Sequence, residues 1–147
     1  MSLTNANPSR PRPIATNYSQ FFWEGARRGK LLIQHCSVCR RYAHPPGPLC
    51  PNCGSAQVDP VEVSGRGTLH SFCRVHHLFH PAFKDDLPYF VARVELAEQT
   101  GLFFIANLRN CPQSAARVGL QVRVLFETVG EDVLPQFEPT ESPESPR

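Results

Sequence analysis

The stretch that decides the fold is HCSVCRRYAHPPGPLCPNCGS, residues 35–55, in which two CxxC pairs are separated by ten residues. The cysteines of the two pairs are Cys36, Cys39, Cys50 and Cys53. Each CxxC turn places two sulfurs on the same side of a metal ion. Four thiolates make a closed tetrahedral shell, which suits zinc and leaves no open position for a substrate or water. The pattern therefore predicts a structural zinc site, with iron in a rubredoxin-like site as the chemical alternative.

Length and composition favour a small folded protein. The chain has 147 residues, which suits one domain, and its 41% hydrophobic and 19% charged content is typical of a globular fold. No apolar run approaches the roughly 18 residues that span a membrane, and the N-terminus lacks the apolar stretch of a signal peptide. We therefore expect a cytoplasmic protein. Cysteines stay reduced there, so the CxxC pairs favour metal binding over disulfides or free thiols.

Charge is unevenly distributed along the chain. Residues 1–41 contain seven lysines or arginines and one acidic residue, Glu24. Residues 42–147 contain eight basic and twelve acidic residues, a net charge of −4. An acidic body disfavours a nucleic-acid groove.

The N-terminal part is predicted to hold an arm and a short helix. Residues 1–16 are rich in Pro, Asn, Ser and Arg without an apolar period, which indicates a flexible arm. Residues 17–30 have apolar residues at helical spacing. Asn17 can cap this helix and Gly29 can end it.

Three aromatic residues follow one another in this helix: Phe21, Phe22 and Trp23. Successive residues cannot all face one core, so at least one aromatic side chain stays exposed unless a partner covers it. Phe22 and Trp23 are therefore candidate partner contacts. Arg41 lies at the end of the basic N-terminal part of the chain, residues 1–41. It is a candidate contact for an acidic partner or for phosphate groups.

Strands dominate the rest of the chain. Residues 31–57 are predicted to form the zinc ribbon, and residues 58–139 contain about five short strands with alternating apolar residues. Closing these strands into an OB-fold barrel removes most open edges. The proline-rich tail, residues 140–147, is predicted to be disordered.

A second notable stretch is SFCRVHHLFHPAF, residues 71–83. Strand alternation from Leu69 predicts that Cys73 and His77 face the core and that Arg74 and His76 face outward. We therefore interpret Cys73 as a buried cysteine rather than a nucleophile. Arg74 and His76 are candidate ligand contacts, because arginine can bind a phosphate through a bidentate pair.

The sequence offers no convincing catalytic set. No Ser/His/Asp arrangement stands out, and there is no glycine-rich phosphate loop. Paired carboxylates occur only at Asp85–Asp86 and Glu131–Asp132, both in predicted loops. A hydrolase or transferase that uses His76 or His77 has the least support.

The order of segments resembles a known family. FFWEGARRGKLLIQHC is followed by the two CxxC pairs, then by SGRGTLHSFC, LPYFVARVEL, VGLQVRVLFE and LPQFEP. This order resembles the acyl-CoA-associated family in which a rubredoxin-like zinc ribbon is joined to an OB-fold, long labelled a domain of unknown function. The resemblance covers about residues 17–139. Two positions depart from the family pattern: Arg40 stands where glycine is common, and Gly47 stands where arginine is common.

The resemblance implies a mainly β protein with a short N-terminal helix, a zinc ribbon and a five-stranded OB-fold. It also implies that the four cysteines are the metal ligands. Members of this family act as partner subunits of thiolase-like enzymes, retro-aldolases or hydratases, and help to hold or channel a CoA thioester.

We therefore expect a non-catalytic accessory subunit that binds an acyl-CoA-processing enzyme in lipid metabolism. The alternative is a single-stranded nucleic-acid-binding OB protein that uses Phe72 and Phe103 as stacking platforms. The residues leave open the partner, the acyl chain and the oligomeric state, a homo-oligomer included.

Overall fold

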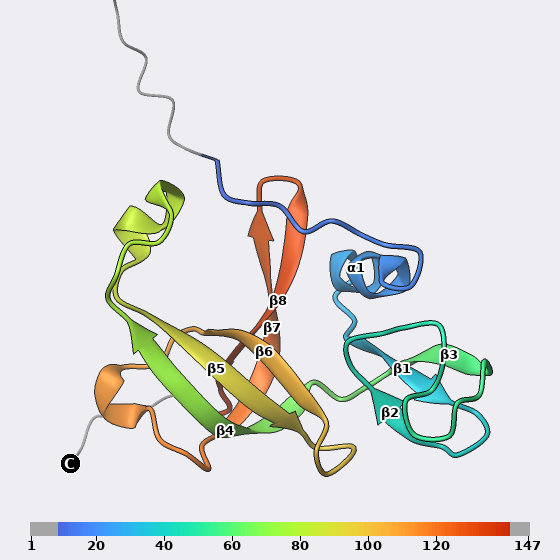
Figure 1. Ribbon diagram of the computed structural model, residues 1–147. Coiled ribbons are helices and arrows are strands. Elements are labelled where there is room, and N and C mark those ends of the chain that lie inside the picture. The colour runs from blue at the N-terminus through green and yellow to red at the C-terminus, as the bar shows by residue number, and fades with distance from the viewer. Residues whose placement is uncertain (1–8, 142–147) are drawn as a thin grey trace, which may run out of the picture.

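The computed structural model describes residues 9–141, which form two β-sheets and a short helix that contacts both (Figure 1). In chain order the elements are α1 (Gln20–Arg27), β1 (Leu32–Cys36), β2 (Tyr42–Ala43), β3 (Val58–Glu62), β4 (Arg66–Val75), η1 (Pro81–Asp86), β5 (Tyr89–Leu96), β6 (Phe103–Leu108), η2 (Gln113–Ala115), β7 (Gln121–Val129) and β8 (Asp132–Pro139). The prediction of a mainly β protein with one short N-terminal helix is confirmed.

The two sheets have separate roles. Strands β2, β1 and β3 form a small antiparallel sheet that carries the cysteine turns, while β4, β5, β6, β8 and β7 close into a barrel. The predicted five-stranded OB-type barrel is confirmed. Closure is weakest between β6 and β8, which pair in parallel only at Leu108 and Phe137.

Helix α1 is shorter than the helix predicted over residues 17–30. The N-cap residue is Ser19 rather than Asn17. A tight turn precedes the helix, in which the Ser19 N–H donates to Thr16 Oγ1 at 3.2 Å and the Thr16 N–H donates to Ser19 Oγ at 2.9 Å. These bonds use the Ser19 hydroxyl before it can cap the helix. The helix therefore begins at Gln20.

The C-terminal end of α1 is the one predicted. Gly29 has φ +71°, a conformation that favours glycine. Its N–H donates to the Ala26 carbonyl at 3.0 Å, and the Lys30 N–H donates to the Gly25 carbonyl at 2.9 Å. This pair of bonds is a Schellman motif, which turns the chain into β1.

The predicted boundary between ribbon and barrel, at residues 57 and 58, falls at the start of β3. Strand β3 pairs along its whole length with β1, from Val58 opposite Cys36 to Glu62 opposite Leu32. It therefore belongs to the ribbon sheet. The chain enters the barrel through Gly65, whose φ of +75° makes the turn before β4.

One continuous core joins the two parts. The inward residues of β5 are Phe90, Ala92, Val94 and Leu96, all buried as the alternation predicts. The same buried cluster includes Phe22 of α1, Ile33 of β1 and Leu31, which directly precedes β1. The ribbon is thus anchored to the barrel by apolar packing rather than by a loose linker.

The predicted arm and tail lie partly outside the described residues. Residues 1–8 of the arm and 142–147 of the tail are not described. Residues 9–16 cross the β7–β8 hairpin near its tip on the way to α1 (Figure 1). Within this segment Arg10 pairs with Asp86, and Arg12 pairs with Asp132. The part of the arm that the structure describes is therefore tied to the barrel by side-chain contacts.

No helix within residues 9–141 is long and apolar enough to cross a membrane.

Candidate functional site

The four cysteines of the two CxxC pairs converge at one end of the ribbon sheet. Their sulfur atoms all lie within 4.8 Å of one another. Cys36 Sγ is 3.7 Å from Cys53 Sγ, and Cys39 Sγ is 3.5 Å from Cys50 Sγ. Cys36 and Cys50 are buried, whereas Cys53 is exposed. Four sulfurs at this spacing are a donor set that suits a tetrahedral metal ion.

Each CxxC pair forms a tight turn closed by backbone hydrogen bonds. The Arg40 N–H donates to the Cys36 carbonyl and the Gly54 N–H donates to the Cys50 carbonyl, both at 2.9 Å. Gly54 has φ +78°, and Arg40 adopts the same left-handed region with φ +63°. Arg40, which stands where the resemblance leads us to expect glycine, therefore makes the turn. Its carbonyl lies 3.0 Å from His35 Nε2, which ties the turn to β1.

The environment of the sulfurs favours negative charge at some positions and opposes it at others. A hydrogen bond with Asn52 lowers the pKa of Cys39 to about 6. The backbone N–H of Cys39 lowers the pKa of Cys36. The backbone N–H of Ser55 lowers the pKa of Cys53, but desolvation and the neighbouring sulfurs outweigh it and raise that pKa to about 11. Four thiolates therefore need a cation between them, which is the condition a bound metal ion meets.

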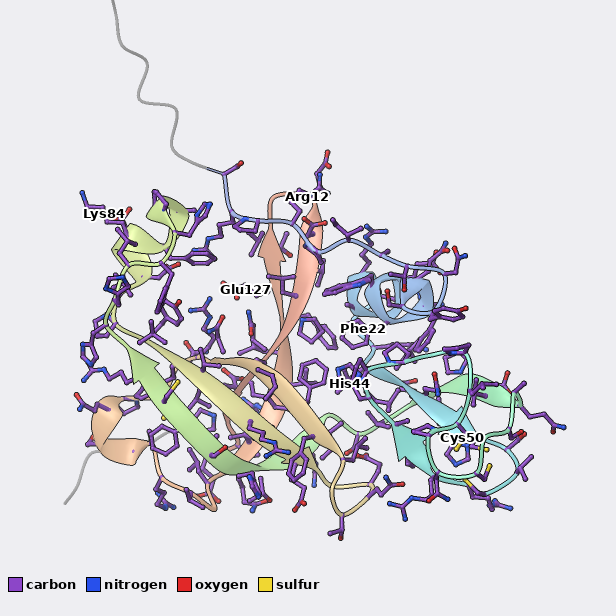
Figure 2. All side chains as sticks on the ribbon, in the orientation of Figure 1. Arg12, Phe22, His44, Cys50, Lys84 and Glu127 are labelled. Atoms are coloured by element: carbon purple, nitrogen blue, oxygen red, sulfur yellow. The ribbon has the colours of Figure 1, made fainter. Side chains whose placement is uncertain are left out.

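His44 lies at the junction of the ribbon, α1 and the barrel. Figure 2 shows it beside Phe22 and away from Cys50. Its ring stacks on Phe104 of β6 at 4.7 Å and lies 5.4 Å from the ring of Phe22. Burial lowers the pKa of His44 to about 4. His44 is therefore a packing residue of this junction.

Polar bonds reinforce the same junction. The side chain of Gln99, in the β5–β6 turn, accepts from the Tyr42 N–H at 2.8 Å and donates to the Tyr42 carbonyl at 3.1 Å. Glu98 accepts from the Ser64 N–H at 2.7 Å. The β5–β6 turn thereby holds the ribbon and the start of the barrel in one arrangement.

A bulge in β4 overturns the predicted faces of the histidine stretch. Leu69 pairs with Val94 and Ser71 pairs with Arg93, so His70 is an extra residue without a partner on β5. An extra residue inverts the alternation for the rest of the strand. The prediction that residues beyond Leu69 continue its pattern is therefore wrong.

The inversion exchanges the faces of Arg74 and Cys73 on β4. Arg74 pairs with Phe90 and so points to the same, inner face, with its guanidinium 6.0 Å from the Phe90 ring. Its side chain also donates to Gln113. Cys73, predicted to be buried, is exposed on the opposite face. Arg74 is therefore held at the barrel end rather than on the outer face.

The two central histidines lie beyond the end of β4 at Val75. His76 and His77 are both exposed. His77, predicted to face the core, makes an edge contact with Phe79, whose ring is 4.8 Å away. Within residues 9–141, no hydrogen bond joins His76 or His77 to a carboxylate or nucleophile. The inward position predicted for His77 is wrong because strand alternation ends before it.

The aromatic candidates of α1 separate clearly. Phe22 is buried, with 6% of its surface exposed, whereas Trp23 is half-buried. Trp23 lines a groove of about 310 Å³ between α1 and the barrel, together with the exposed Ile105 and with Leu134. Trp23 therefore remains a candidate partner contact. The buried ring of Phe22 packs edge-on against it, with ring centres 4.9 Å apart. Arg41 is exposed on the ribbon.

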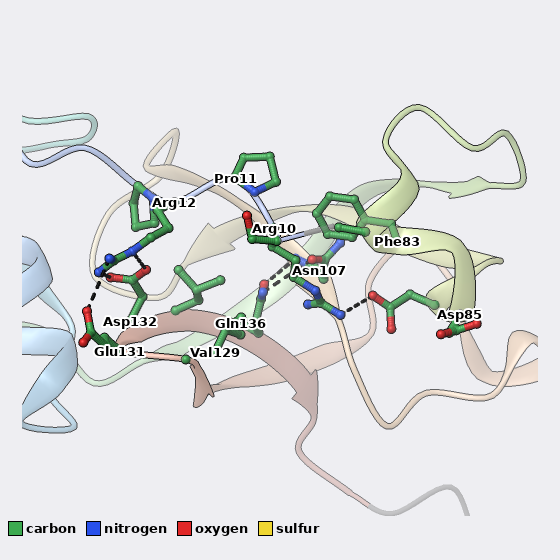
Figure 3. Close-up of a pocket in the computed structure, with 16 residues that line it drawn as sticks. Arg10, Pro11, Arg12, Phe83, Asp85, Asn107, Val129, Glu131, Asp132 and Gln136 are labelled. Atoms are coloured by element: carbon green, nitrogen blue, oxygen red, sulfur yellow. Dashed lines mark hydrogen bonds and ion pairs between the residues drawn. The ribbon is translucent and has the colours of Figure 1, made fainter. Parts of the chain in front are cut away.

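A larger groove of about 670 Å³ lies between η1, the tip of the β7–β8 hairpin and residues 9–13 (Figure 3). Its floor includes Asn107 and Gln136, which also line the groove beside Trp23. Gln136 Oε1 accepts from the backbone N–H of Asn107 at 2.7 Å, and Asn107 Nδ2 donates to the Phe90 carbonyl at 2.9 Å, so both side-chain amides already have partners. Sequence reasoning missed this groove. The available signal was the pair of acidic dipeptides, Asp85–Asp86 and Glu131–Asp132, which form its two walls.

The comparison with known proteins matches both parts of the structure. One family model, ChsH2, rubredoxin-like zinc ribbon domain, matches residues 23–59, and another, ChsH2, C-terminal OB-fold domain, matches residues 60–127. A similar solved chain, described as Ltp2-ChsH2(DUF35) aldolase, is 39% identical with a TM-score of 0.79, and the match covers 88% of this chain and all of that chain.

Two sequence relatives give the same assignment. A probable enoyl-CoA hydratase alpha subunit of Thermomonospora curvata is 41% identical over 131 residues, which make up 88% of this chain but only 40% of the relative. A DUF35 domain-containing scaffold protein of Methanothermobacter thermautotrophicus is 30% identical over 107 residues, which make up 72% of this chain and 78% of the relative. The chain therefore belongs to the DUF35 family and consists of a ChsH2-type zinc ribbon and OB-fold.

Proposed function

We propose that the chain is a non-catalytic accessory subunit that binds and stabilises an acyl-CoA-processing enzyme. The observation that carries the proposal is the similarity, over the whole solved chain, to a component of the Ltp2-ChsH2(DUF35) aldolase. The relatives named as a hydratase alpha subunit and as a scaffold protein point in the same direction. An aldolase or a hydratase is therefore the preferred partner, and a thiolase-like enzyme is a further option from the family resemblance.

The metal has a structural role in this proposal. Cys36, Cys39, Cys50 and Cys53 would hold one zinc ion through four thiolates. A closed shell of this kind supplies folding free energy and leaves no position for substrate. The ribbon has only a three-stranded sheet, whose β2 contributes two residues, so a metal staple suits its size.

The partner surface proposed here is the groove beside Trp23. Ile105 has 61% of its surface exposed and lies in this groove with Trp23 and Pro135. An exposed apolar side chain flanked by a half-buried tryptophan is typical of the centre of a protein interface. The groove is continuous with the ribbon through Phe104, which stacks on His44.

We assign contacts with the CoA thioester to basic residues of the ribbon and of the end of β4. Arg40 and Arg41 are exposed on the ribbon, close to the sulfurs, and have no acidic partner within residues 9–141. Lys30, by contrast, lies 3.6 Å from Glu62. We assign Arg41 to the phosphates of CoA, and Arg74 with His76 to further contacts with the thioester ligand.

The direct test is reconstitution. The chain is purified alone and together with the product of an adjacent aldolase, hydratase or thiolase gene, and turnover of acyl-CoA is measured for each sample. The expected result is co-elution, with turnover by the pair and none by this chain. Robust turnover by this chain alone, abolished by His76→Ala or His77→Ala, would overturn the proposal.

Two matched variants locate the interface. Ile105→Ala removes an exposed side chain from the Trp23 groove, and we expect the dissociation constant of the complex to rise at least fivefold. Val118→Ala removes a similar side chain, 69% exposed, which does not line this groove. Equal affinities for the two variants would place the enzyme elsewhere on the surface.

A further inference from the structure

Residues 9–13, here called the strap, cross the larger groove and contact both of its walls (Figure 3). On one side Arg10 pairs with Asp86 of η1, and its guanidinium lies 5.1 Å from the centre of the Phe83 ring. On the other side Arg12 donates to the two carboxylate oxygens of Asp132 at 2.7 and 3.0 Å. The strap therefore connects η1 to the tip of the β7–β8 hairpin, segments that are distant in the sequence.

The strap is attached through its side chains alone. Among the described residues, no backbone hydrogen bond links residues 9–13 to the rest of the molecule. Pro11 and Pro13 have no backbone N–H and favour an extended chain. Arg12 is 60% exposed and its second partner Glu131 is 84% exposed, so this ion pair is accessible to water and salt, whereas Arg10 and Asp86 are 28% and 27% exposed. Such an attachment is specific in its geometry but can be displaced.

The walls of the groove carry more negative charge than the strap neutralises. Four carboxylates line it, from Asp85, Asp86, Glu131 and Asp132, against the two arginines of the strap. Asp85 has no basic partner within residues 9–141, and Glu131, 3.3 Å from Arg12, is 84% exposed. The phosphates of CoA are therefore disfavoured here, whereas a cationic segment is favoured.

The floor of the groove defines the shape of such a segment. Apolar contacts come from Phe83, Val129 and Leu134, and the side-chain amides of Asn107 and Gln136 already have hydrogen-bond partners. The site thus offers carboxylates at both walls and little polar recognition between them. This arrangement fits an extended segment with two arginines separated by one compact residue, as in the strap itself.

We propose that the strap is a displaceable occupant and that this groove is the docking site for an extended Arg-X-Arg segment of the partner enzyme. The identity of the partner as that enzyme rests on the proposed function, but the recognition chemistry rests on the groove alone. In the free subunit the strap fills the site, and in the complex the arginines of the incoming segment replace Arg10 and Arg12 on Asp86 and Asp132.

The test uses the full chain and a fluorescent peptide with the sequence of residues 9–15, SRPRPIA, and needs neither enzyme nor CoA. The variant Arg10→Gln/Arg12→Gln frees the carboxylates, so we expect saturable binding of the peptide in an anisotropy titration. Wild-type chain should bind at least tenfold more weakly, because its own strap competes at a high effective concentration. Adding Asp86→Asn and Asp132→Asn to the variant should also weaken binding at least tenfold.

The control peptide, with both arginines replaced by glutamine, should not bind. Equal binding of the two peptides, or no saturable binding to the strap variant, would overturn the docking site. A second measurement does not depend on the multiple variants. Hydrogen exchange of wild-type residues 81–86 should accelerate when salt is raised from about 0.05 to 0.5 M, because screening loosens the strap. Exchange that does not respond to salt would contradict a displaceable strap.

Discussion

His44 and Phe104 stack across the boundary between the ribbon and the barrel, with ring centres 4.7 Å apart and ring planes 20° apart. The imidazole has no hydrogen-bond partner among residues 9–141 and lies against a second aromatic ring, that of Phe22. Burial lowers its pKa to about 4. The neutral form of His44 is therefore part of the joint between the two parts of the molecule.

This joint predicts a pH-dependent stability. The pKa of His44 is 6.5 in the unfolded chain and about 4 in the folded chain. The contribution is fully present above pH 6.5 and is lost as pH falls toward 4, by up to about 3 kcal/mol. Chemical denaturation at several pH values measures it. His44→Phe keeps a ring in the stack but does not titrate, so its free energy of unfolding should fall less over the same range. Parallel pH curves for the two proteins would refute this role.

Zinc content is the second prediction. Protein purified without added metal should contain close to one equivalent of zinc by elemental analysis. Cys50→Ser should lose the metal and unfold the ribbon, because three thiolates leave the shell open. Cys73→Ser is the matched control, since this cysteine is exposed and lies outside the sulfur cluster. Unchanged metal content and melting in Cys50→Ser would exclude the four-sulfur site.

Nucleic-acid binding should be weak. Phe103 is already covered by Arg93, whose guanidinium lies 3.7 Å from the ring centre, and by His70 at 4.7 Å. Phe72 packs edge-on against Phe90. Phe103 is therefore not a free stacking platform, and residues 42–147 carry a net charge of −4, so single-stranded DNA should bind with a dissociation constant of about 10⁻⁴ M or weaker at physiological salt. Tight, salt-resistant binding that Phe103→Ala or Phe72→Ala abolishes would favour the nucleic-acid alternative.

Gly65 should be intolerant of any side chain. Its φ is +75°, and a Cβ atom there would lie 2.3 Å from Cγ1 of Val124. We expect Gly65→Ala to lower the free energy of unfolding by about 2–3 kcal/mol through strain and overpacking. Gly101→Ala isolates the backbone effect, because Gly101 has φ +80° but no atom within 4 Å of the added Cβ. Its cost should stay near 1 kcal/mol, and equal losses for both variants would exclude the contact with Val124.

The sequence by itself determined the features that depend on local chemistry. Two CxxC pairs with a short spacer are a metal-ligand pattern, so the spacing of Cys36, Cys39, Cys50 and Cys53 was enough to predict a shared site. Alternation likewise predicted the buried face of β5, because a regular strand has a side-chain period of two residues. The five-stranded barrel followed from the number of such strands and from the cost of open edges.

Only the tertiary structure decided the features that depend on neighbours distant in sequence. The bulge at His70 exists because β4 pairs with β5 in two registers, and no residue of β4 alone announces it. Arg10 and Arg12 can pair with Asp86 and Asp132 only because the closed barrel places η1 and the β7–β8 hairpin on either side of one groove. The sequence shows which residues carry charge. Which of these residues form ion pairs depends on closure of the barrel, because strand pairing sets the distances between residues that lie far apart in the chain.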